Sequence, residues 1–226
     1  MENHALFPVI VSKFDYAFND SVKDFLFSER AIEKFFKDGI SCEPIFNALH
    51  HERELSGFYK FVTASVASYL EACAVDPETF DIMMHKSWLN VGQGEGNPQH
   101  DHSDSHISFC YYVNAPFKNS LRFYSTNRNQ EPYDGFFETY VKDGNWNVFN
   151  SRSWSFPPVE GGLFVFPARL PHAVDGEIGK KAGIKSVDDL KKCRVAIAGD
   201  VLLVGKKVIV GNYRAVQPPT FWRKFD

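Results

Sequence analysis

The stretch that decides the fold of this chain is short and dense in histidine. It reads Gln99-His100-Asp101-His102-Ser103-Asp104-Ser105-His106 and continues directly into Ile107-Ser108-Phe109-Cys110-Tyr111-Tyr112-Val113. The apolar second half predicts a β-strand. In an extended segment alternate side chains point to the same face, so the three histidines and Asp104 can all project to one side. Imidazole and carboxylate groups gathered in this way could bind one Fe, Zn, Ni or Cu ion, whereas the alternative is a polar, solvated loop.

A further histidine, His172, lies downstream, shortly after another predicted strand. A Gly-Gly pair at 161–162 indicates a tight turn, residues 163–166 a short buried strand, and Pro167 the end of that strand. In a double-stranded β-helix, the strand that carries a histidine pair lies beside a later strand, which returns one more histidine to the same pocket. The alternative is a surface-loop histidine beside a proline, and the upstream cluster makes that alternative the weaker one.

An arginine, Arg194, opens a third informative segment. Residues 193–198 read Cys-Arg-Val-Ala-Ile-Ala, the pattern of a half-buried or fully buried strand. An arginine at the start of such a strand is either a salt-bridge partner at the rim or a buried guanidinium that awaits an acid. Because guanidinium binds carboxylates through two hydrogen bonds, the second interpretation predicts a dicarboxylate ligand.

Helical patterns precede the strands along the chain. A helix is predicted to start at Asn19, with an apolar face that continues to Phe36, and a second helix is predicted over residues 56–75. Residues 1–12 are predicted as an edge strand. Further strands are expected at residues 86–91, 107–113, 120–124, 136–141, 145–149, 162–166, 193–198 and 200–210. We therefore expect a single α+β domain over residues 1–226, a double-stranded β-helix (a cupin-like jelly roll) braced by N-terminal helices.

These segments together resemble the iron(II)- and 2-oxoglutarate-dependent oxygenases, in particular the small oxygenases common in marine bacteria and phages. The resemblance is carried by Leu6-Phe7-Pro8-Val9, Ser87-Trp88-Leu89-Asn90-Val91, Gln99-His100-Asp101-His102 with Ser108 to Val113, Gly161 to His172, and Arg194-Val195-Ala196-Ile197-Ala198. It runs through most of the chain, and the order and spacing of the segments are more specific than any one of them. The resemblance implies a jelly-roll fold, Fe(II) and 2-oxoglutarate as cofactors, and Arg194 as the residue that holds the C5 carboxylate of 2-oxoglutarate.

Two metal-ligand sets remain open. The pair His102-x-Asp104, completed by His172, matches the pattern of two histidines and one carboxylate. Counting six residues on from Gly94 instead places His100 at the first-ligand position and His102 at the usual carboxylate position. That register gives a set of three histidines with His172. All four residues are candidates, and we favour His100 and His102.

Two further features depart from the family pattern. The small hydroxyl residue expected two positions after Arg194 is replaced by Ala196, so one contact to 2-oxoglutarate is missing. Roughly ten residues are inserted between His172 and Arg194, and residues 186–192 among them read as a short capped helix that could act as a lid.

The resemblance implies a non-haem Fe(II)- and 2-oxoglutarate-dependent dioxygenase. With O₂ it would hydroxylate a small molecule or an amino-acid-like substrate and release succinate and CO₂. The main rival is a cupin-type isomerase or dioxygenase, which would share the fold and His172 without needing a buried Arg194. In that comparison His106 stands where the first cupin motif has a glutamate. A relative that has lost its metal and binds without catalysis is a third hypothesis, and the intact histidine cluster argues against it.

Net charge, apolar runs and cysteine spacing indicate which classes of binding partner and which cellular location to expect. A net charge of −3 argues against bulk attraction to nucleic acid. No stretch reaches the roughly 18 apolar residues of a membrane helix, and the N-terminus lacks the pattern of a signal peptide, so no membrane partner is expected. The four cysteines are scattered without a Cys-x-x-Cys pair, which fits reduced thiols and a cytoplasmic location.

Overall fold

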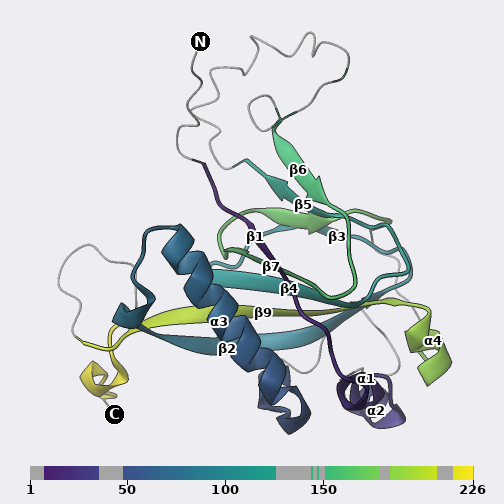
Figure 1. Ribbon diagram of the computed structural model, residues 1–226, viewed down its shortest axis with the longest axis horizontal. Coiled ribbons are helices and arrows are strands. Elements are labelled where there is room, and N and C mark those ends of the chain that lie inside the picture. Colours follow the sequence, from purple (N-terminus) through teal and green to yellow (C-terminus); the bar gives the residue numbers. More distant parts are fainter. Residues whose placement is uncertain are drawn as a thin grey trace.

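Two antiparallel β-sheets, braced by helices, form the protein (Figure 1). The computed structural model describes residues 8–35, 48–125, 144, 147, 151–178, 184–207 and 216–225. The strands are β1 (Ser12–Asp15), β2 (Phe80–Gly92), β3 (Asn97–His100), β4 (Ile107–Asn114), β5 (Leu121–Tyr124), β6 (Ser153–Phe156), β7 (Gly162–Pro167), β8 (His172–Val174) and β9 (Arg194–Gly205). One sheet has the order β1-β7-β4-β9-β2 and the other β3-β8-β5-β6. This arrangement confirms the α+β double-stranded β-helix.

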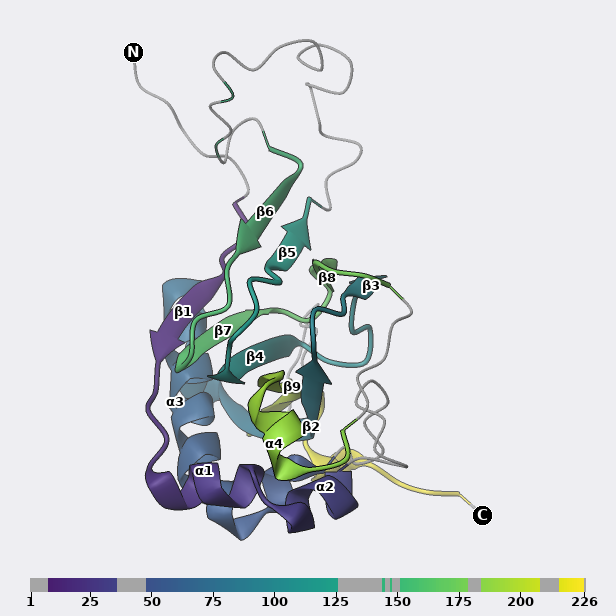
Figure 2. The ribbon, with the colours of Figure 1, turned by 90° about the vertical axis from the view of Figure 1, so that its right-hand side faces the viewer.

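The helices lie mainly on the outer side of the five-stranded sheet. They are α1 (Asp20–Leu26), α2 (Glu29–Phe35), α3 (Ser56–Ala72) and α4 (Val187–Lys191), with 3₁₀ turns at Leu49–His51, Arg53–Leu55, Pro77–Thr79 and Pro219–Phe221. In Figure 1 the long helix α3 crosses the sheet that contains β4, β9 and β2. Figure 2 shows α1 and α2 below that sheet, whereas β5 and β6 extend away from the helices. Among the described residues, no helix is long and apolar enough to cross a membrane.

Strand β4 separates an outer core from an inner one. On its outer face Tyr111 packs against Phe58 of α3, with 4.9 Å between the ring centroids, and both belong to the large buried cluster under the helices. Because neighbouring residues of a strand face opposite ways, Tyr112 points between the two sheets. There it lies 6.2 Å from the ring of Phe164 on β7. The inner core is therefore lined by alternate residues of β4, β7 and β9.

Local signals explain the helix boundaries. The Asn19 side chain accepts a hydrogen bond from the Val22 backbone N–H, which is the N-cap predicted from the sequence. The predicted helix is interrupted, because α1 ends at Leu26 and α2 begins after Ser28, whose hydroxyl accepts a hydrogen bond from the Ala31 N–H. Phe36 lies outside the described residues. The short helix α4 is confirmed, with the Ser186 hydroxyl as its N-cap.

Several strand boundaries differ from the sequence prediction. The first strand begins at Ser12, and residues 8–11 before it are not in a strand. The two strands predicted over 193–198 and 200–210 are one continuous strand, β9, which pairs with both β2 and β4. The strands predicted at 136–141 and 145–149 fall almost entirely outside the described residues. Strands β3, β6 and β8 were not predicted, and β3 and β8 position the histidines.

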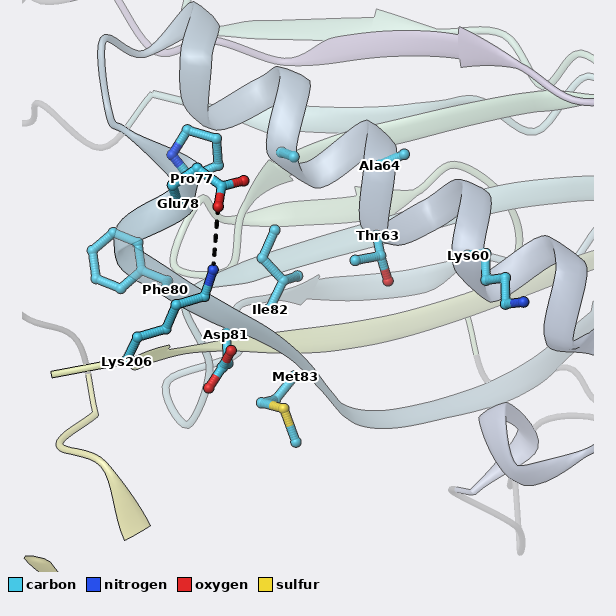
Figure 3. Close-up of a pocket in the computed structure, with 11 residues that line it drawn as sticks. Lys60, Thr63, Ala64, Pro77, Glu78, Phe80, Asp81, Ile82, Met83 and Lys206 are labelled. Atoms are coloured by element: carbon cyan, nitrogen blue, oxygen red, sulfur yellow. Dashed lines mark hydrogen bonds and ion pairs between the residues drawn. The ribbon is translucent and has the colours of Figure 1, made fainter. Parts of the chain in front are cut away.

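A groove on the helical side is a separate feature. It lies between α3 and the start of β2, and its lining includes Lys60 and Thr63 of the helix and Ile82 and Met83 of the strand (Figure 3). An ion pair between Lys206 Nζ and Glu78 Oε2, 3.5 Å apart, crosses one end. None of the four candidate metal ligands lines this groove.

Candidate metal centre and neighbouring anion pocket

The structure brings three of the candidate ligands together. His100 ends β3 and His172 begins β8, and the two residues are cross-strand partners. His102 follows β3 in a loop, where its backbone N–H donates to the Ala168 carbonyl at 2.9 Å. One ligand atom from each of the three histidines lies within 4.8 Å of the others. Three nitrogen donors at this separation can surround one metal ion.

Each imidazole of this cluster has its Nδ1 atom engaged. Nδ1 of His100 lies 2.8 Å from the Pro98 carbonyl, and Nδ1 of His172 lies 2.9 Å from the Leu170 carbonyl. Nδ1 of His102 lies 2.6 Å from Oδ1 of Asp200. Carbonyl and carboxylate oxygens only accept hydrogen bonds, so each Nδ1 carries the proton. The three Nε2 lone pairs therefore remain for a metal, and imidazole suits Fe, Zn, Ni and Cu.

Burial keeps His172 in the form that binds metal. The residue is 6% exposed, and this burial lowers the pKa of His172 to about 4, with smaller contributions from the neighbouring His100 and His102. Its ring packs against Phe166, with centroids 5.0 Å apart, and against Phe123 at 6.2 Å. At neutral pH His172 is therefore a neutral imidazole with a free lone pair.

Asp104 and His106 lie elsewhere, so the expectation that the whole stretch projects to one face is wrong. Strand β3 ends at His100, and the next residues turn before β4 begins. The Asp104 side chain, 55% exposed, forms an ion pair with Lys86 at 3.1 Å. His106 Nδ1 accepts a hydrogen bond from the Leu203 backbone N–H at 3.1 Å. Of the two ligand sets, only the three histidines come together.

The inner face of β9 links the histidines to Arg194. Alternate residues of this strand share a face, so Arg194, Ala196, Ala198 and Asp200 form one row between the sheets. Asp200 at one end of the row contacts His102, and Arg194 at the other end is 4% exposed. The two residues between them, Ala196 and Ala198, have the smallest side chains that carry a Cβ atom.

The guanidinium of Arg194 lacks partners for two of its nitrogen atoms. Its buried Nε and Nη1 atoms have no hydrogen-bond partner among the residues that the structure describes. The buried hydroxyl of Tyr112 makes no hydrogen bond of ordinary geometry within this part of the chain, and its polar neighbour there is the weakly accepting Cys110 thiol. Tyr112 is the cross-strand partner of Ala196. Burial raises the pKa of Tyr112, so its hydroxyl keeps the proton and can donate it. Buried polar groups normally have partners, so these three donors indicate a site for an anion.

A carboxylate fits this donor set. A guanidinium offers two parallel N–H donors to one carboxylate, and the phenol can add a third hydrogen bond. Gly92 lies beside the arginine: a Cβ atom there would lie 3.3 Å from Nη2 of Arg194 and 2.9 Å from Oε2 of the buried Glu95. Arg194 was identified from the sequence, whereas Tyr112 and Asp200 were not. No local pattern marks these two residues, and the pairing of β4 with β9 brings them to the site.

Aromatic side chains surround the histidine cluster. The ring of Trp88 on β2 lies 5.8 Å from that of His102. On the smaller sheet, register places His100, His172, Phe123 and Trp154 in one cross-strand row. Phe123 is buried and Trp154 is 41% exposed, so the row leads from the histidines towards the surface.

Residues 86–184 match the family model described as "Putative 2OG-Fe(II) oxygenase". This segment contains His100, His102 and His172, and Arg194 follows ten residues after its end. Among the curated proteins, none matches the chain.

Solved structures with a similar arrangement were also found. An oxidoreductase of the 2OG-Fe(II) oxygenase family from Burkholderia pseudomallei has 10% identity and a TM-score of 0.35, over 54% of this chain and 45% of the other. A Pseudomonas putida prolyl-4-hydroxylase has 12% identity and a TM-score of 0.47, over 85% and 92%. The non-heme alpha ketoglutarate dependent epimerase SnoN from nogalamycin biosynthesis has 10% identity and a TM-score of 0.49, over 84% and 77%. The match of residues 86–184, which hold the three clustered histidines, to the 2OG-Fe(II) oxygenase family model confirms the family resemblance of the sequence.

Proposed function

We propose that the protein is a non-haem Fe(II)- and 2-oxoglutarate-dependent dioxygenase that hydroxylates a small-molecule or amino-acid-like substrate. The observation that carries this proposal is the pairing of two features in one interior. The three histidines leave their Nε2 atoms for a metal, and His102 contacts Asp200 at one end of the β9 row. Arg194 at the other end and the nearby Tyr112 carry three donors without partners among the described residues. A metal site and a buried carboxylate site in one interior are what a metal-chelating 2-oxo dicarboxylate requires.

The chain's own residues would have three tasks. His100, His102 and His172 would bind Fe(II) through Nε2 and leave coordination positions open. Arg194 and Tyr112 would hold the carboxylate of 2-oxoglutarate that lies away from the metal, and so orient the 2-oxo acid. The aromatic side chains around the cluster would exclude water. When bound, Fe(II) and 2-oxoglutarate supply the oxidising chemistry, with O₂ consumed and succinate and CO₂ released.

The cupin hypothesis gives no reason for the second feature. A metal-binding isomerase or dioxygenase without 2-oxoglutarate would use the histidines, but it would leave Arg194 and Tyr112 with buried donors that have no acceptor among the described residues. Unpartnered buried donors cost stability, so their presence favours a ligand that completes them. This argument supports the oxygenase over the cupin.

An anaerobic titration tests the proposal. Fe(II) is added to the metal-free protein, then 2-oxoglutarate, and a visible charge-transfer band is expected only when both are present. Glutarate is the matched control, because it has two carboxylates at the same spacing and no keto group, so it should bind without producing the band. Fe(II) binding with no response to 2-oxoglutarate would favour the cupin, and no Fe(II) binding would refute the metal site.

A further inference from the structure

A buried carboxylate lies directly behind one of the three histidines. Asp200 sits in the middle of β9 and is 0% exposed. Its Oδ1 atom lies 2.6 Å from His102 Nδ1 and accepts a hydrogen bond from the Ser108 hydroxyl at 2.5 Å. Desolvation of a carboxylate is costly, so a buried aspartate requires compensating partners. The partners of Asp200 include a ligand of the candidate metal centre.

The charge of Asp200 is only partly balanced. Its Oδ2 atom lies 3.2 Å from Lys86 Nζ. The same ammonium also contacts Asp104, at 3.2 and 3.1 Å from its two carboxylate oxygens. One positive charge is thus shared between two negative ones, and the trio keeps a net charge of −1. This negative charge lies beside His102, one of the three clustered histidines.

The three histidines differ in what fixes their tautomers. Backbone carbonyls of Pro98 and Leu170 accept from His100 and His172, and no substitution of a side chain removes them directly. The acceptor for His102 is the side chain of Asp200. A carboxylate can only accept, so it forces the proton of His102 onto Nδ1 and leaves Nε2 free.

We propose that Asp200 is a positioning residue that locks the His102 tautomer and supplies negative charge to the metal centre from behind that ligand. In sites with two histidines and one carboxylate, the charge comes from a ligand itself. Here the third ligand is a histidine, so the negative charge lies one residue further from the metal, on Asp200 behind His102. The inference rests on the proposed function only in that His102 is a metal ligand.

Asp200→Asn tests the inference, because the amide has nearly the shape of the carboxylate but no charge, and it can donate as well as accept. In the metal-free wild type, ¹⁵N–¹H correlation spectra should show His102 protonated at Nδ1. In Asp200→Asn, His102 should change towards the Nε2-protonated tautomer. Co(II), titrated without 2-oxoglutarate into the full chain, should bind about 10–100-fold more weakly to the variant, the usual range for loss of such a partner.

Asp104→Asn is the matched control. Asp104, like Asp200, forms an ion pair with Lys86, so this substitution also removes one negative charge beside that lysine. The Asp104 side chain is exposed, however, and does not contact His102. The substitution should leave the tautomer and the Co(II) affinity within about twofold of wild type, since exposed ion pairs contribute little. Lys86→Met should bind Co(II) at least as tightly as wild type. Equal weakening by Lys86→Met and Asp200→Asn would instead show that the network only supports the fold, and would overturn the proposal.

The spectra of the metal-free wild type test the tautomer without any variant. If His102 carries its proton on Nε2 there, the inference is wrong, whether or not Asp200→Asn folds. Unchanged Co(II) affinity in a folded Asp200→Asn protein would also overturn it. Failure of wild type to bind Co(II) would count against the metal centre in the proposed function, and would be distinguishable from failure of the tautomer lock.

Discussion

Tyr112→Phe is expected to change stability and ligand affinity in opposite directions. The Tyr112 hydroxyl is buried without a partner in the described part of the chain, and the residue is 1% exposed. An unsatisfied buried polar group costs about 1–3 kcal/mol, and removal of the oxygen leaves a small gap that offsets part of the gain. We expect the free energy of unfolding of the ligand-free protein to rise by about 1 kcal/mol, and the thermal midpoint to rise by about 2–4 °C.

The same substitution should weaken 2-oxoglutarate binding. The proposed hydrogen bond has a charged acceptor, and such bonds contribute about 1.5–3 kcal/mol, which corresponds to about 10–150-fold in affinity. Calorimetric titration of 2-oxoglutarate into the anaerobic Fe(II) protein measures this loss, and urea unfolding of the metal-free protein measures the gain in stability.

Tyr111→Phe is the control on the neighbouring residue. The Tyr111 hydroxyl donates to the Tyr16 carbonyl at 2.8 Å, on the opposite face of β4. Its loss should destabilise the protein by about 0.5–1.5 kcal/mol and leave 2-oxoglutarate affinity unchanged. If Tyr112→Phe behaves like Tyr111→Phe, with lower stability and unaltered affinity, the hydroxyl is not part of an anion site and the reasoning fails.

Three further outcomes are expected. Arg194→Lys should weaken 2-oxoglutarate binding by about 10–150-fold in calorimetry, because an ammonium cannot form the bidentate hydrogen bond of a guanidinium to a carboxylate. Fe(II) affinity should stay the same, and equal losses for Fe(II) and 2-oxoglutarate would contradict this prediction. Asp104→Ala should retain Fe(II) in an equilibrium binding assay, whereas His100→Ala and His172→Ala should each lose it; the reverse pattern would restore the ligand set with Asp104. The pKa of His172 is lowered from 6.5 to about 4. Between these two pH values the imidazole of His172 is protonated in the unfolded chain but stays neutral in the folded, metal-free protein. The free energy of unfolding should therefore fall by up to about 3 kcal/mol as the pH drops from 6.5 to 4. Urea unfolding of His172→Gln should show a smaller fall over this range, and an equal fall in wild type and variant would contradict the prediction.

The sequence contained enough to predict the fold and the three histidines of the candidate metal centre that cluster in the structure. Buried strands at 107–113 and 162–166 have strong apolar patterns, and they form the middle of the five-stranded sheet. Counting from Gly94 favoured His100 and His102, and these are the residues that meet His172 in the structure. The literal His-x-Asp pattern at Asp104 was misleading because the strand ends at His100. After the turn that follows, the Asp104 side chain forms an ion pair with Lys86 and lies away from the histidines.

The missed features depend on register rather than on local pattern. Ser108 and Asp200 are 92 positions apart in the chain, and only the pairing of β4 with β9 makes them neighbours. The same pairing brings Tyr112 opposite Ala196. Strand β3 was not predicted because Asn-Pro-Gln-His has no apolar alternation, and its pairing with β8 determines that it is extended. Such pairings join segments that are far apart in the chain, so no local pattern of residues encodes them.

A crystal structure of the protein grown anaerobically with Fe(II) and 2-oxoglutarate would test the central claim most directly. An anomalous-difference peak for iron should lie about 2.0–2.2 Å from Nε2 of His100, His102 and His172, if iron–nitrogen bonds are close to those of zinc. One carboxylate of 2-oxoglutarate should lie within hydrogen-bond distance of Arg194 Nε and Nη1 and of the Tyr112 hydroxyl. Iron bound elsewhere, or a 2-oxoglutarate carboxylate that leaves Arg194 without an acceptor, would contradict the account.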